Sequence, residues 1–322
     1  MEPEISVVIP TRNTRGLTLS ALRSLHDQAR APLEIILVDD GSSDGTIEAV
    51  SEKFPSVRCL RIDVSLGFTG AVNLGVRATT GNLIWLLNSD TVICPDAVEL
   101  LISNFDRDPS LGISGAALSY PDGAAQWSGG PFPGYLWLFG QASGLPKLLG
   151  RVSIWRKVKP VSGTTTREVD WVTGAAMALR RKVWNDVGPL EDVYRFYCQD
   201  LDLCWRAKKQ GWKISILPDV RVVHKLGGTI GSACDAVGAV HANHMWRDLV
   251  QFFVIHHGIR AGIRAARSIR IGGWFRVMIR KIVAPFVARS NRARWRIDTR
   301  AYVKALRETT RTASALSGSQ PQ

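Results

Sequence analysis

The sequence predicts an α/β protein with a Rossmann-like, mostly parallel sheet flanked by helices, and three observations support this class. Apolar, β-branched segments alternate with amphipathic segments of helical spacing over the first hundred residues. The apolar segments are short and continuous, as in strands that are buried on both faces. Polar residues follow each of them directly, as expected at the carboxyl edge of a parallel sheet.

The first half of the chain supplies most of the predicted elements. Pro10 ends the first strand, and Pro95 precedes a helix, which is the end at which proline is favoured. We expect strands at 5–9, 34–38, 57–62 and 83–87, and helices at 14–28, from about 46 to 54, at 69–78 and at 95–105. Alternation of this kind is typical of βαβ units.

The pattern is weaker in the second half. Residues 119–168 are rich in Gly, Pro, Ser and aromatic residues, so we expect long surface loops there. Beyond them the sequence predicts a buried strand at 171–179, helices at 181–187 and 200–209, and strands at 212–217 and 221–223.

Composition and charge divide the chain. It has 322 residues, of which 45% are apolar, so it can bury a core and is not a disordered protein. The net charge is +13. Residues 241–322 hold 16 Lys and Arg against three Asp and Glu, which accounts for all of it. We therefore predict a neutral domain over 1–240, a basic helical extension over 241–311 and a disordered tail over 312–322.

The basic extension predicts an anionic partner. Trp and Phe beside Arg and Lys in amphipathic helices suit an anionic membrane surface, although ordinary helix packing with a solvated Arg face is the alternative. Gly272-Gly273 is expected to break the extension into two helices. No nucleic-acid recognition motif accompanies the charge, so nucleic acid is not an expected partner.

The expected location is the cytoplasmic side of the membrane. No apolar run reaches the roughly 18 residues of a membrane-spanning helix. The acidic N-terminus does not resemble a signal peptide, and the five scattered cysteines favour a reducing compartment. We expect a cytoplasmic protein held peripherally on the inner face of the cell membrane.

Four polar clusters follow the predicted strands, and a parallel sheet would bring them to one edge. The alternative is that such residues only cap helices and form turns. The clusters are Thr11-Arg12-Asn13, Asp39-Asp40, residues 65–73 and Asn88-Ser89-Asp90.

Several motifs together resemble the family 2 glycosyltransferases, which have the GT-A fold, and in particular bacterial rhamnosyltransferases. The resemblance covers residues 4–230, and its most specific segments are Val38 to Thr46 and Gln199 to Arg206. The other motifs are Val8 to Thr11, Gly67-Phe68 with Asn73 to Gly75, Asn88 to Thr91, and Gly174 to Met177.

The resemblance implies a site for a nucleotide-sugar donor. Asp40 would accept a hydrogen bond from a pyrimidine N–H, and Asp39 would orient the loop or meet the ribose. Arg12 stands where relatives often carry an aromatic ring, and Ser65 where they carry Asn, so both contacts depart from the family pattern. The implied donor-binding residues are Pro10, Thr11, Arg12, Asp39, Asp40, Gly67, Asn73, Asn88, Ser89 and Asp90.

The resemblance also implies Mg²⁺ or Mn²⁺ at Asp90, the last residue of a DxD-like motif in which Asn88 replaces the first carboxylate. A divalent ion with oxygen ligands neutralises the charge that develops on a leaving diphosphate. His224, after a late predicted strand, matches a histidine that completes the metal site in some relatives. Without the resemblance, a structural role would be the better interpretation of a single histidine.

Inverting transfer needs a base that deprotonates the acceptor hydroxyl. The resemblance gives this role to Asp200, with Gln199 replacing the usual Glu. The alternative is that Asp200 only stabilises a helix N-terminus. Acceptor contacts are implied for Trp171, Thr173, Gly174, Asp202, Trp205 and Arg206, although Trp171 suits an apolar core and Asp202 a structural role.

The function expected from the resemblance is inverting, metal-dependent transfer of a sugar, with L-rhamnose from dTDP-rhamnose as the best candidate, to a lipid-linked or cell-wall glycan. Two alternatives stay open: a family 2 enzyme with a UDP-sugar donor, and a non-catalytic nucleotide-sugar-binding or scaffold protein with the same fold. The sequence does not determine the oligomeric state.

Overall fold

The computed structural model describes residues 4–28, 31–145, 166–195, 197–225, 237–286, 299–300 and 302–309. The chain divides into two units. Unit 1 comprises residues 1–132, 157–192 and 199–232, and unit 2 comprises 133–156, 193–198 and 233–322. A domain boundary near residue 240 stays a prediction. The expected disorder of 312–322 lies outside the described residues.

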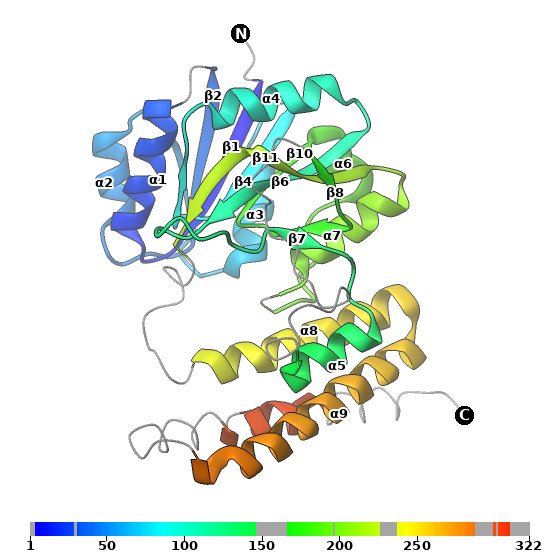
Figure 1. The fold of residues 1–322 in the computed structure, drawn as a ribbon. Coiled ribbons are helices and arrows are strands. Elements are labelled where there is room, and N and C mark those ends of the chain that lie inside the picture. The colour runs from blue at the N-terminus through cyan, green and yellow to red at the C-terminus, as the bar shows by residue number, and fades with distance from the viewer. Residues whose placement is uncertain are drawn as a thin grey trace. The chain divides into compact units, whose positions relative to one another are not determined.

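The main sheet belongs to unit 1. Over the described residues it has nine strands in the order β3-β2-β1-β4-β10-β6-β11-β5, with β8 added beside β11 (Figure 1). The strands are β1 Ile5–Thr11, β2 Leu33–Asp39, β3 Arg58–Arg61, β4 Leu83–Leu87, β5 Thr91–Ile93, β6 Leu111–Ser119, β8 Arg167–Glu168, β10 Ala176–Arg180 and β11 Lys213–His224. Two further strands, β7 Gly129–Gly130 and β9 Trp171–Val172, pair with each other.

The sheet is mixed, with a parallel half that carries the predicted strand ends. β1 pairs in parallel with both β2 and β4, and β2 pairs in parallel with β3. The next strand, β10, is antiparallel to β4 and to β6. The carboxyl ends of β1, β2 and β4 therefore open onto one edge of the sheet.

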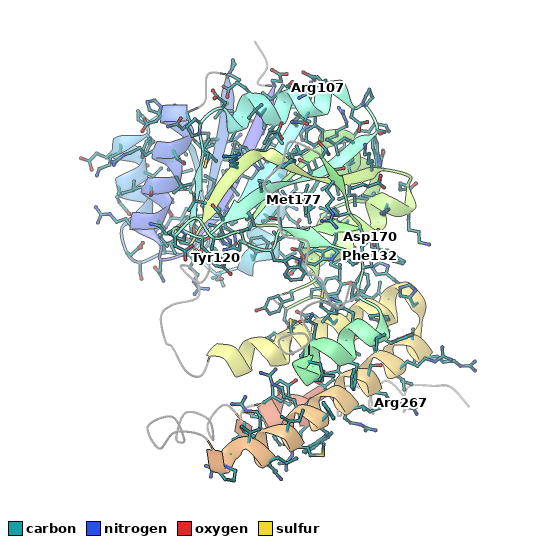
Figure 2. The ribbon with its side chains drawn as sticks, in the orientation of Figure 1. Arg107, Tyr120, Phe132, Asp170, Met177 and Arg267 are labelled. Carbon is teal, nitrogen blue, oxygen red and sulfur yellow. The ribbon has the colours of Figure 1, made fainter. Side chains whose placement is uncertain are left out.

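Helices cover both faces of this sheet because its strands are apolar on both sides. In β4, Trp85 packs into the core that contains residues of α1, α2 and α4, whereas Ile84 and Leu86 pack into the core formed with α3, α6 and α7. Met177 of β10 lies within the sheet (Figure 2). The helices are α1 Arg15–Gln28, α2 Thr46–Lys53, α3 Gly67–Arg77, α4 Ala97–Arg107, α6 Arg181–Val187 and α7 Gln199–Lys209.

The loops expected over 119–168 contain more order than the sequence indicated. The described part of this range includes β7, β8 and the helix α5 Tyr135–Ser143. Tyr120 forms a tight turn with Gly123, whose N–H donates to the Tyr120 carbonyl (Figure 2). Phe132 is fixed by its N–H, which donates to Asp170 Oδ2 at 3.0 Å. A tight turn and a hydrogen bond between residues 38 positions apart leave no apolar periodicity in the sequence, which is why this order was not visible.

Two predicted strand boundaries were wrong. The apolar run 171–179 forms two strands, β9 and β10, separated by a turn at 173–175. Conversely, the segments 212–217 and 221–223 belong to one strand, β11, because it continues past Pro218 with a shift of register against β6. Proline interrupts a ladder bond but a bulge absorbs the interruption.

The described part of unit 2 contains α5, α8 Val237–His257, α9 Ile259–Val283 and the short 3-10 helix η3 Ala284–Phe286, and residues 302–309 are also helical. The predicted break at Gly272-Gly273 was wrong, since α9 runs through both residues. These glycines are buried where a Cβ would collide with the backbone of Phe139 and the side chain of Leu306. They serve close packing of helices, and this outweighs the low helix propensity of glycine.

No helix within the described ranges is both long enough and apolar enough to cross a lipid bilayer.

Candidate active site

The loops after β1 and β2 are joined by hydrogen bonds. The Asp40 N–H donates to the Thr11 carbonyl at 2.9 Å, and Pro10 pairs with Val38 in the register of the two strands. Asn13, at a positive φ of 52°, accepts the Ser43 N–H on Oδ1 at 2.8 Å. The first two predicted clusters therefore meet, as the parallel arrangement required.

The hydroxyl groups predicted at the donor site are held inside the protein. Thr11 Oγ1 lies 2.8 Å from Thr14 Oγ1 and 2.7 Å from Thr18 Oγ1. Thr14 Oγ1 in turn lies 3.0 Å from Ser89 Oγ, so the network joins the end of β1 to the turn after β4. Thr11 and Ser89 are at most 2% exposed. Their hydroxyls fix the distance between two strand ends.

Asp39 and Asp40 have different surroundings. The Asp40 carboxylate accepts three bonds from the following loop: Ser65 Oγ at 2.6 Å, the Leu66 N–H at 2.7 Å and the Gly67 N–H at 3.1 Å. Asp39 accepts the Ser42 N–H on Oδ2, and its buried Oδ1 has no hydrogen-bond partner. Asp40 thus holds the loop, and Asp39 has the oxygen that is unsatisfied.

Arg12 reaches the same loop. Its Nη1 donates to Ser65 Oγ at 2.7 Å, and the Ser65 hydroxyl in turn donates a hydrogen bond to Asp40 Oδ2. The two residues that depart from the family pattern therefore contact each other. A guanidinium held in this way at an exposed position can stack on a planar ring.

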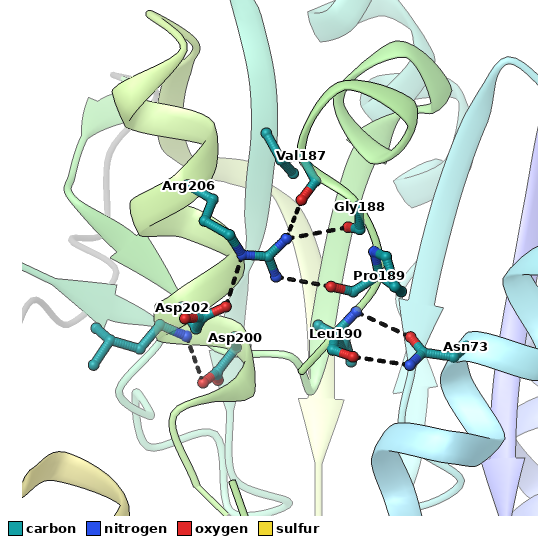
Figure 3. Close-up of polar contacts among 9 residues, drawn as sticks. Asn73, Val187, Gly188, Pro189, Leu190, Asp200, Asp202 and Arg206 are labelled. Carbon is teal, nitrogen blue, oxygen red and sulfur yellow. Dashed lines mark hydrogen bonds and ion pairs between the residues drawn. The ribbon is translucent and has the colours of Figure 1, made fainter. Parts of the chain in front are cut away.

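Asn73 lies on α3, and the backbone of Leu190 engages both ends of its amide. Its Nδ2 donates to the Leu190 carbonyl at 2.9 Å, and its Oδ1 accepts the Leu190 N–H at 3.0 Å (Figure 3). The side chain is 7% exposed. The resemblance implied a donor contact here, whereas the geometry shows a clamp between α3 and the turn after α6.

Arg206 of α7 fixes the same turn from the other side. Its guanidinium donates to the carbonyl groups of Val187, Gly188 and Pro189, and its Nε lies 2.8 Å from Asp202 Oδ2 (Figure 3). The Asp202 side chain is 1% exposed. Two residues predicted to contact the acceptor therefore form a buried pair that attaches α7 to the turn 187–190.

Asp90 and His224 approach each other although 134 residues separate them in the sequence. β5 and β11 pair in antiparallel fashion, which sets Thr91 opposite His224. His224 Nε2 lies 3.2 Å from Asp90 Oδ1, and the two side chains are 6% and 3% exposed. This contact does not have the geometry of a hydrogen bond, and Asp90 Oδ1 is buried without such a partner.

The pair fits a divalent cation that takes its remaining ligands from a substrate. Within the described residues no group of three or more His, Cys, Asp and Glu side chains could hold a metal ion. An unsatisfied carboxylate oxygen beside an imidazole nitrogen nevertheless offers an oxygen ligand of the type that Mg²⁺ and Mn²⁺ prefer and a nitrogen ligand of the type that transition-metal ions such as Mn²⁺ accept. Asn88 forms a turn with Thr91 around Asp90, since its backbone carbonyl accepts the Thr91 N–H at 3.2 Å.

Asp200 begins α7 and faces the turn between β9 and β10. Its Oδ2 accepts the Gly174 N–H at 2.9 Å, and its Oδ1 accepts the Leu201 N–H at 2.8 Å. Burial raises the pKa of the Asp200 carboxyl above its ordinary value, and these backbone N–H groups oppose the rise. Next to Gly174, the Ala175 carbonyl accepts the Asn88 N–H at 3.0 Å, so this turn connects the Asp200 and Asp90 regions.

Aromatic side chains surround this turn. Trp171 donates from its indole N–H to the Pro131 carbonyl at 3.1 Å and packs edge-on against Trp127, with ring centroids 4.8 Å apart. Trp205 packs against Phe132 at the same separation. Of the other predicted acceptor residues, Thr173 donates its backbone N–H to the Ser128 carbonyl at 2.9 Å.

Two residues of interest were absent from the sequence prediction. Phe68 is 40% exposed, and its Cζ lies 3.9 Å from where a Cβ on Gly174 would stand, so its ring borders the Asp200 region. Gln126 contacts His224, 98 residues away. The Gly67-Phe68 motif could have indicated Phe68 from the sequence, whereas no local pattern indicates Gln126.

The structure has the GT-A fold, and the family model that matches its first half identifies the protein as a glycosyltransferase. The chain carries a family 2 glycosyltransferase domain, because residues 6–164 match the model of the family described as "Glycosyl transferase family 2". The resemblance found in the motifs is thereby confirmed.

One relative and two solved structures illustrate the likeness. The N-acetylglucosaminyl-diphospho-decaprenol L-rhamnosyltransferase of Mycobacterium tuberculosis is 27% identical over 281 residues, which are 80% of this chain and 82% of that protein. The mannosyltransferase PcManGT of Pyrobaculum calidifontis, solved with GDP-Man and Mn²⁺, has a TM-score of 0.59 at 16% identity over 98% of this chain and 88% of its own. GalNAc-T7, solved with UDP, GalNAc and Mn²⁺, has a TM-score of 0.57 at 14% identity, and the match covers 98% of this chain and 58% of that chain.

Proposed function

We propose that this glycosyltransferase is an inverting enzyme that transfers L-rhamnose from dTDP-L-rhamnose to a lipid-linked glycan. The observation that carries the proposal is the likeness, over 80% of this chain, to a protein named for L-rhamnosyl transfer to N-acetylglucosaminyl-diphospho-decaprenol. The acceptor class that we propose is a polyprenyl-diphosphate-linked or cell-wall saccharide.

The donor would bind at the carboxyl ends of β1, β2 and β4. Asp39 is the candidate to bind the nucleobase or the ribose of the donor, since its Oδ1 is buried and has no hydrogen-bond partner. Asp40 supports this site indirectly, by holding the loop 65–67 with three hydrogen bonds. Arg12 is the candidate to stack on the base.

Asp90 and His224 would hold Mg²⁺ or Mn²⁺ together with oxygens of the donor diphosphate. The bound ion would supply the positive charge that stabilises the departing nucleoside diphosphate. Two solved structures with the same fold, one with GDP-Man and one with UDP and GalNAc, contain Mn²⁺, which supports a divalent ion without selecting one.

Asp200 would accept the proton of the acceptor hydroxyl while this oxygen attacks the anomeric carbon from the face opposite the leaving group. A carboxylate whose pKa is raised by burial is a stronger base than an exposed one. The Gly174 and Leu201 N–H groups keep its two oxygens in fixed directions. Trp171 and Phe68 border this region and offer apolar faces for a sugar ring.

A direct assay tests the proposal. The protein is incubated with Mg²⁺ or Mn²⁺, a panel of dTDP- and UDP-sugars and a polyprenyl-diphospho-N-acetylglucosamine acceptor, and release of nucleoside diphosphate is measured. We expect dTDP release that requires both dTDP-L-rhamnose and the acceptor, with inversion at the anomeric carbon of the product. Release of UDP from a UDP-sugar, with no release of dTDP from any dTDP-sugar, would contradict the proposed donor. If no donor released a nucleoside diphosphate, a non-catalytic binding protein would be favoured.

We further propose that unit 2 binds an anionic membrane surface through one face of α9. Apolar residues in the second half of this helix are exposed: Ile271 by 61%, Trp274 by 45%, Met278 by 51% and Ile282 by 62%. In the first half the same face carries the exposed Arg260, Arg264 and Arg267, the last of which is labelled in Figure 2. Spacings of three and four residues align both sets.

A basic cavity adjoins this face. Trp274 and Lys281 of α9 line it together with Arg300, Lys304 and Arg307, and its volume is about 470 Å³. Four cationic side chains around an indole suit a phosphate-bearing headgroup at a lipid interface. The opposite side of α9, with Ala265, Ala266 and Ile269, is buried.

Vesicle sedimentation tests this second proposal. We expect binding to phosphatidylcholine vesicles only when phosphatidylglycerol is included, with weakening at high salt. The double variant Trp274→Ser and Ile282→Ser should lose most of the binding, whereas Ile255→Ser, exposed by 45% on α8, should retain it. Equal binding by both variants would contradict a role for α9.

A further inference from the structure

We propose that Gln126 is a positioning residue that fixes which nitrogen of His224 faces Asp90 and thereby presets His224 as a metal ligand. The inference rests on the metal site of the proposed function. Gln126 is 4% exposed and makes two contacts with the same residue. Its Nε2 donates to the His224 carbonyl at 3.2 Å, and its Oε1 lies 2.6 Å from His224 Nδ1.

The first contact determines the orientation of the Gln126 amide. A backbone carbonyl only accepts hydrogen bonds, so the amide atom that faces it must be the nitrogen. The amide oxygen is then the atom that faces His224 Nδ1, and it needs a proton from that nitrogen. An imidazole that binds a metal ion through Nε2 carries its proton on Nδ1, and this is the proton that the amide oxygen of Gln126 accepts.

The lone pair of Nε2 points toward a second electron-rich atom. Asp90 Oδ1 lies 3.2 Å away and is buried without a hydrogen-bond partner. With the proton on Nδ1, the Nε2 and Oδ1 lone pairs repel each other unless a cation lies beside both. Ligands at right angles around an ion at about 2.1 Å lie roughly 3 Å apart, so the observed separation suits two neighbouring ligands of one metal ion.

The fold brings Gln126 to this place through a turn in the chain. Residues 120–123 reverse the direction after β6, and the Gln126 N–H donates to the Leu118 carbonyl at 2.8 Å. Ser119 forms an isolated bridge with Ala125 and pairs with Val223 of β11. Backbone contacts with β6, which itself pairs with β11, therefore place Gln126 next to His224.

An ordinary role for Gln126 would be to satisfy buried polar groups without influence on a metal. The two roles make different predictions for metal binding. Outer partners that orient a ligating histidine typically change metal affinity by about 10- to 100-fold. A purely structural glutamine would change the melting temperature and leave the affinity of the folded protein for metal nearly unchanged.

The test compares Gln126→Met and Gln126→Glu with the wild type by calorimetric titration of Mn²⁺ in the presence of dTDP and, separately, UDP. Gln126→Met should weaken Mn²⁺ binding by about 10-fold or more. Gln126→Glu retains an oxygen for the Nδ1 proton but loses the donor to the His224 carbonyl, so it should recover part of the affinity that Gln126→Met loses. Thr79→Val is the matched control, because it removes a buried hydroxyl far along the chain from this site and should leave Mn²⁺ binding unchanged.

A spectroscopic measurement gives a second readout that a structural role would not move. Electron spin-echo modulation of bound Mn²⁺ should show a coupled imidazole nitrogen in the wild type, none in His224→Ala, and a weakened coupling in Gln126→Met. Wild-type affinity and nitrogen coupling in Gln126→Met, with both lost in His224→Ala, would overturn the inference while the proposed metal site stands. Absence of Mn²⁺-dependent nucleotide binding in the wild type would overturn both.

Discussion

The backbone N–H of Gly174 donates to Asp200 Oδ2 at 2.9 Å, and this bond attaches the proposed base to the turn between β9 and β10. The neighbouring Ala175 carbonyl binds the Asn88 N–H, two residues before Asp90. One turn of the chain therefore connects the place where a proton would be taken up with the place where a diphosphate would leave. The following predictions depend on this arrangement and on the packing that supports it.

Asp200→Asn should lower kcat by about 100- to 10,000-fold, because an amide cannot accept the acceptor proton. Donor binding should remain within a few-fold of the wild type, since Asp200 contacts only backbone groups of the turn and of its own helix. Calorimetry with the donor nucleotide and steady-state kinetics measure the two effects. Asp186→Asn, on the surface of α6, is the control, and full activity of Asp200→Asn would remove Asp200 from the role of base.

The pH dependence of transfer should reflect the raised pKa of Asp200. Its carboxyl has a pKa above the ordinary 3.8 because burial disfavours the charged form. The active carboxylate is lost as the pH falls through this raised value, so kcat/KM should decline on the acid side at a higher pH than an exposed Asp would give. A profile of kcat/KM that is flat down to pH 3.8, measured where the protein stays folded, would contradict this assignment.

Arg206→Met should destabilise unit 1 by about 3 kcal/mol in urea unfolding, because it leaves the charge of Asp202 buried and frees three carbonyl groups of the turn 187–190. Lys182→Met breaks an exposed pair with Asp186 and should cost less than about 1 kcal/mol. Equal losses in the two variants would show that the Asp202 pair is not effectively buried.

Gly75→Ala and Gly16→Ala should shift stability in opposite directions. A Cβ at Gly75 would collide with the side chain of Val8 and stand 2.9 Å from Val38 Cγ2, so overpacking of α3 against the sheet should cost about 1 to 3 kcal/mol. At Gly16 nothing lies within 4 Å of the new Cβ, and the higher helix propensity of alanine should add up to about 1 kcal/mol. Melting temperatures that move together would contradict the packing argument.

Much of the fold could be predicted from the sequence because strands buried on both faces have a continuous apolar pattern. β4 was predicted with its observed bounds, and α6 also has the bounds expected from sequence. α5 was not predicted, since it lies in a segment whose glycines and aromatics show no helical period. The continuity of α9 through Gly272-Gly273 depends on Phe139 and Leu306, which are distant in the sequence.

The candidate site shows the same division. The sequence indicated that Asp39, Asp40, Asp90 and Asp200 follow strands or begin a helix, which are positions where carboxylates gather at one edge. The resemblance gave the contact with the nucleobase to Asp40 and the orientation of the loop to Asp39, whereas three hydrogen bonds from residues 65–67 show that Asp40 is the residue that holds the loop. Asn73, Asp202 and Arg206 were expected to face ligands, and their hydrogen bonds instead join α3 and α7 to the turn 187–190.

The sequence by itself determined the α/β class, the alternation of the first strands and helices along the chain, and the carboxylates that follow these strands, because all three depend on local apolar patterning. The sheet that it predicted to be mostly parallel is mixed. Only the tertiary structure decided that Gln126 orients His224 toward Asp90 and that Gly174 anchors Asp200. These contacts join residues from 26 to 134 positions apart, and such pairings depend on strand register and burial rather than on any local sequence signal.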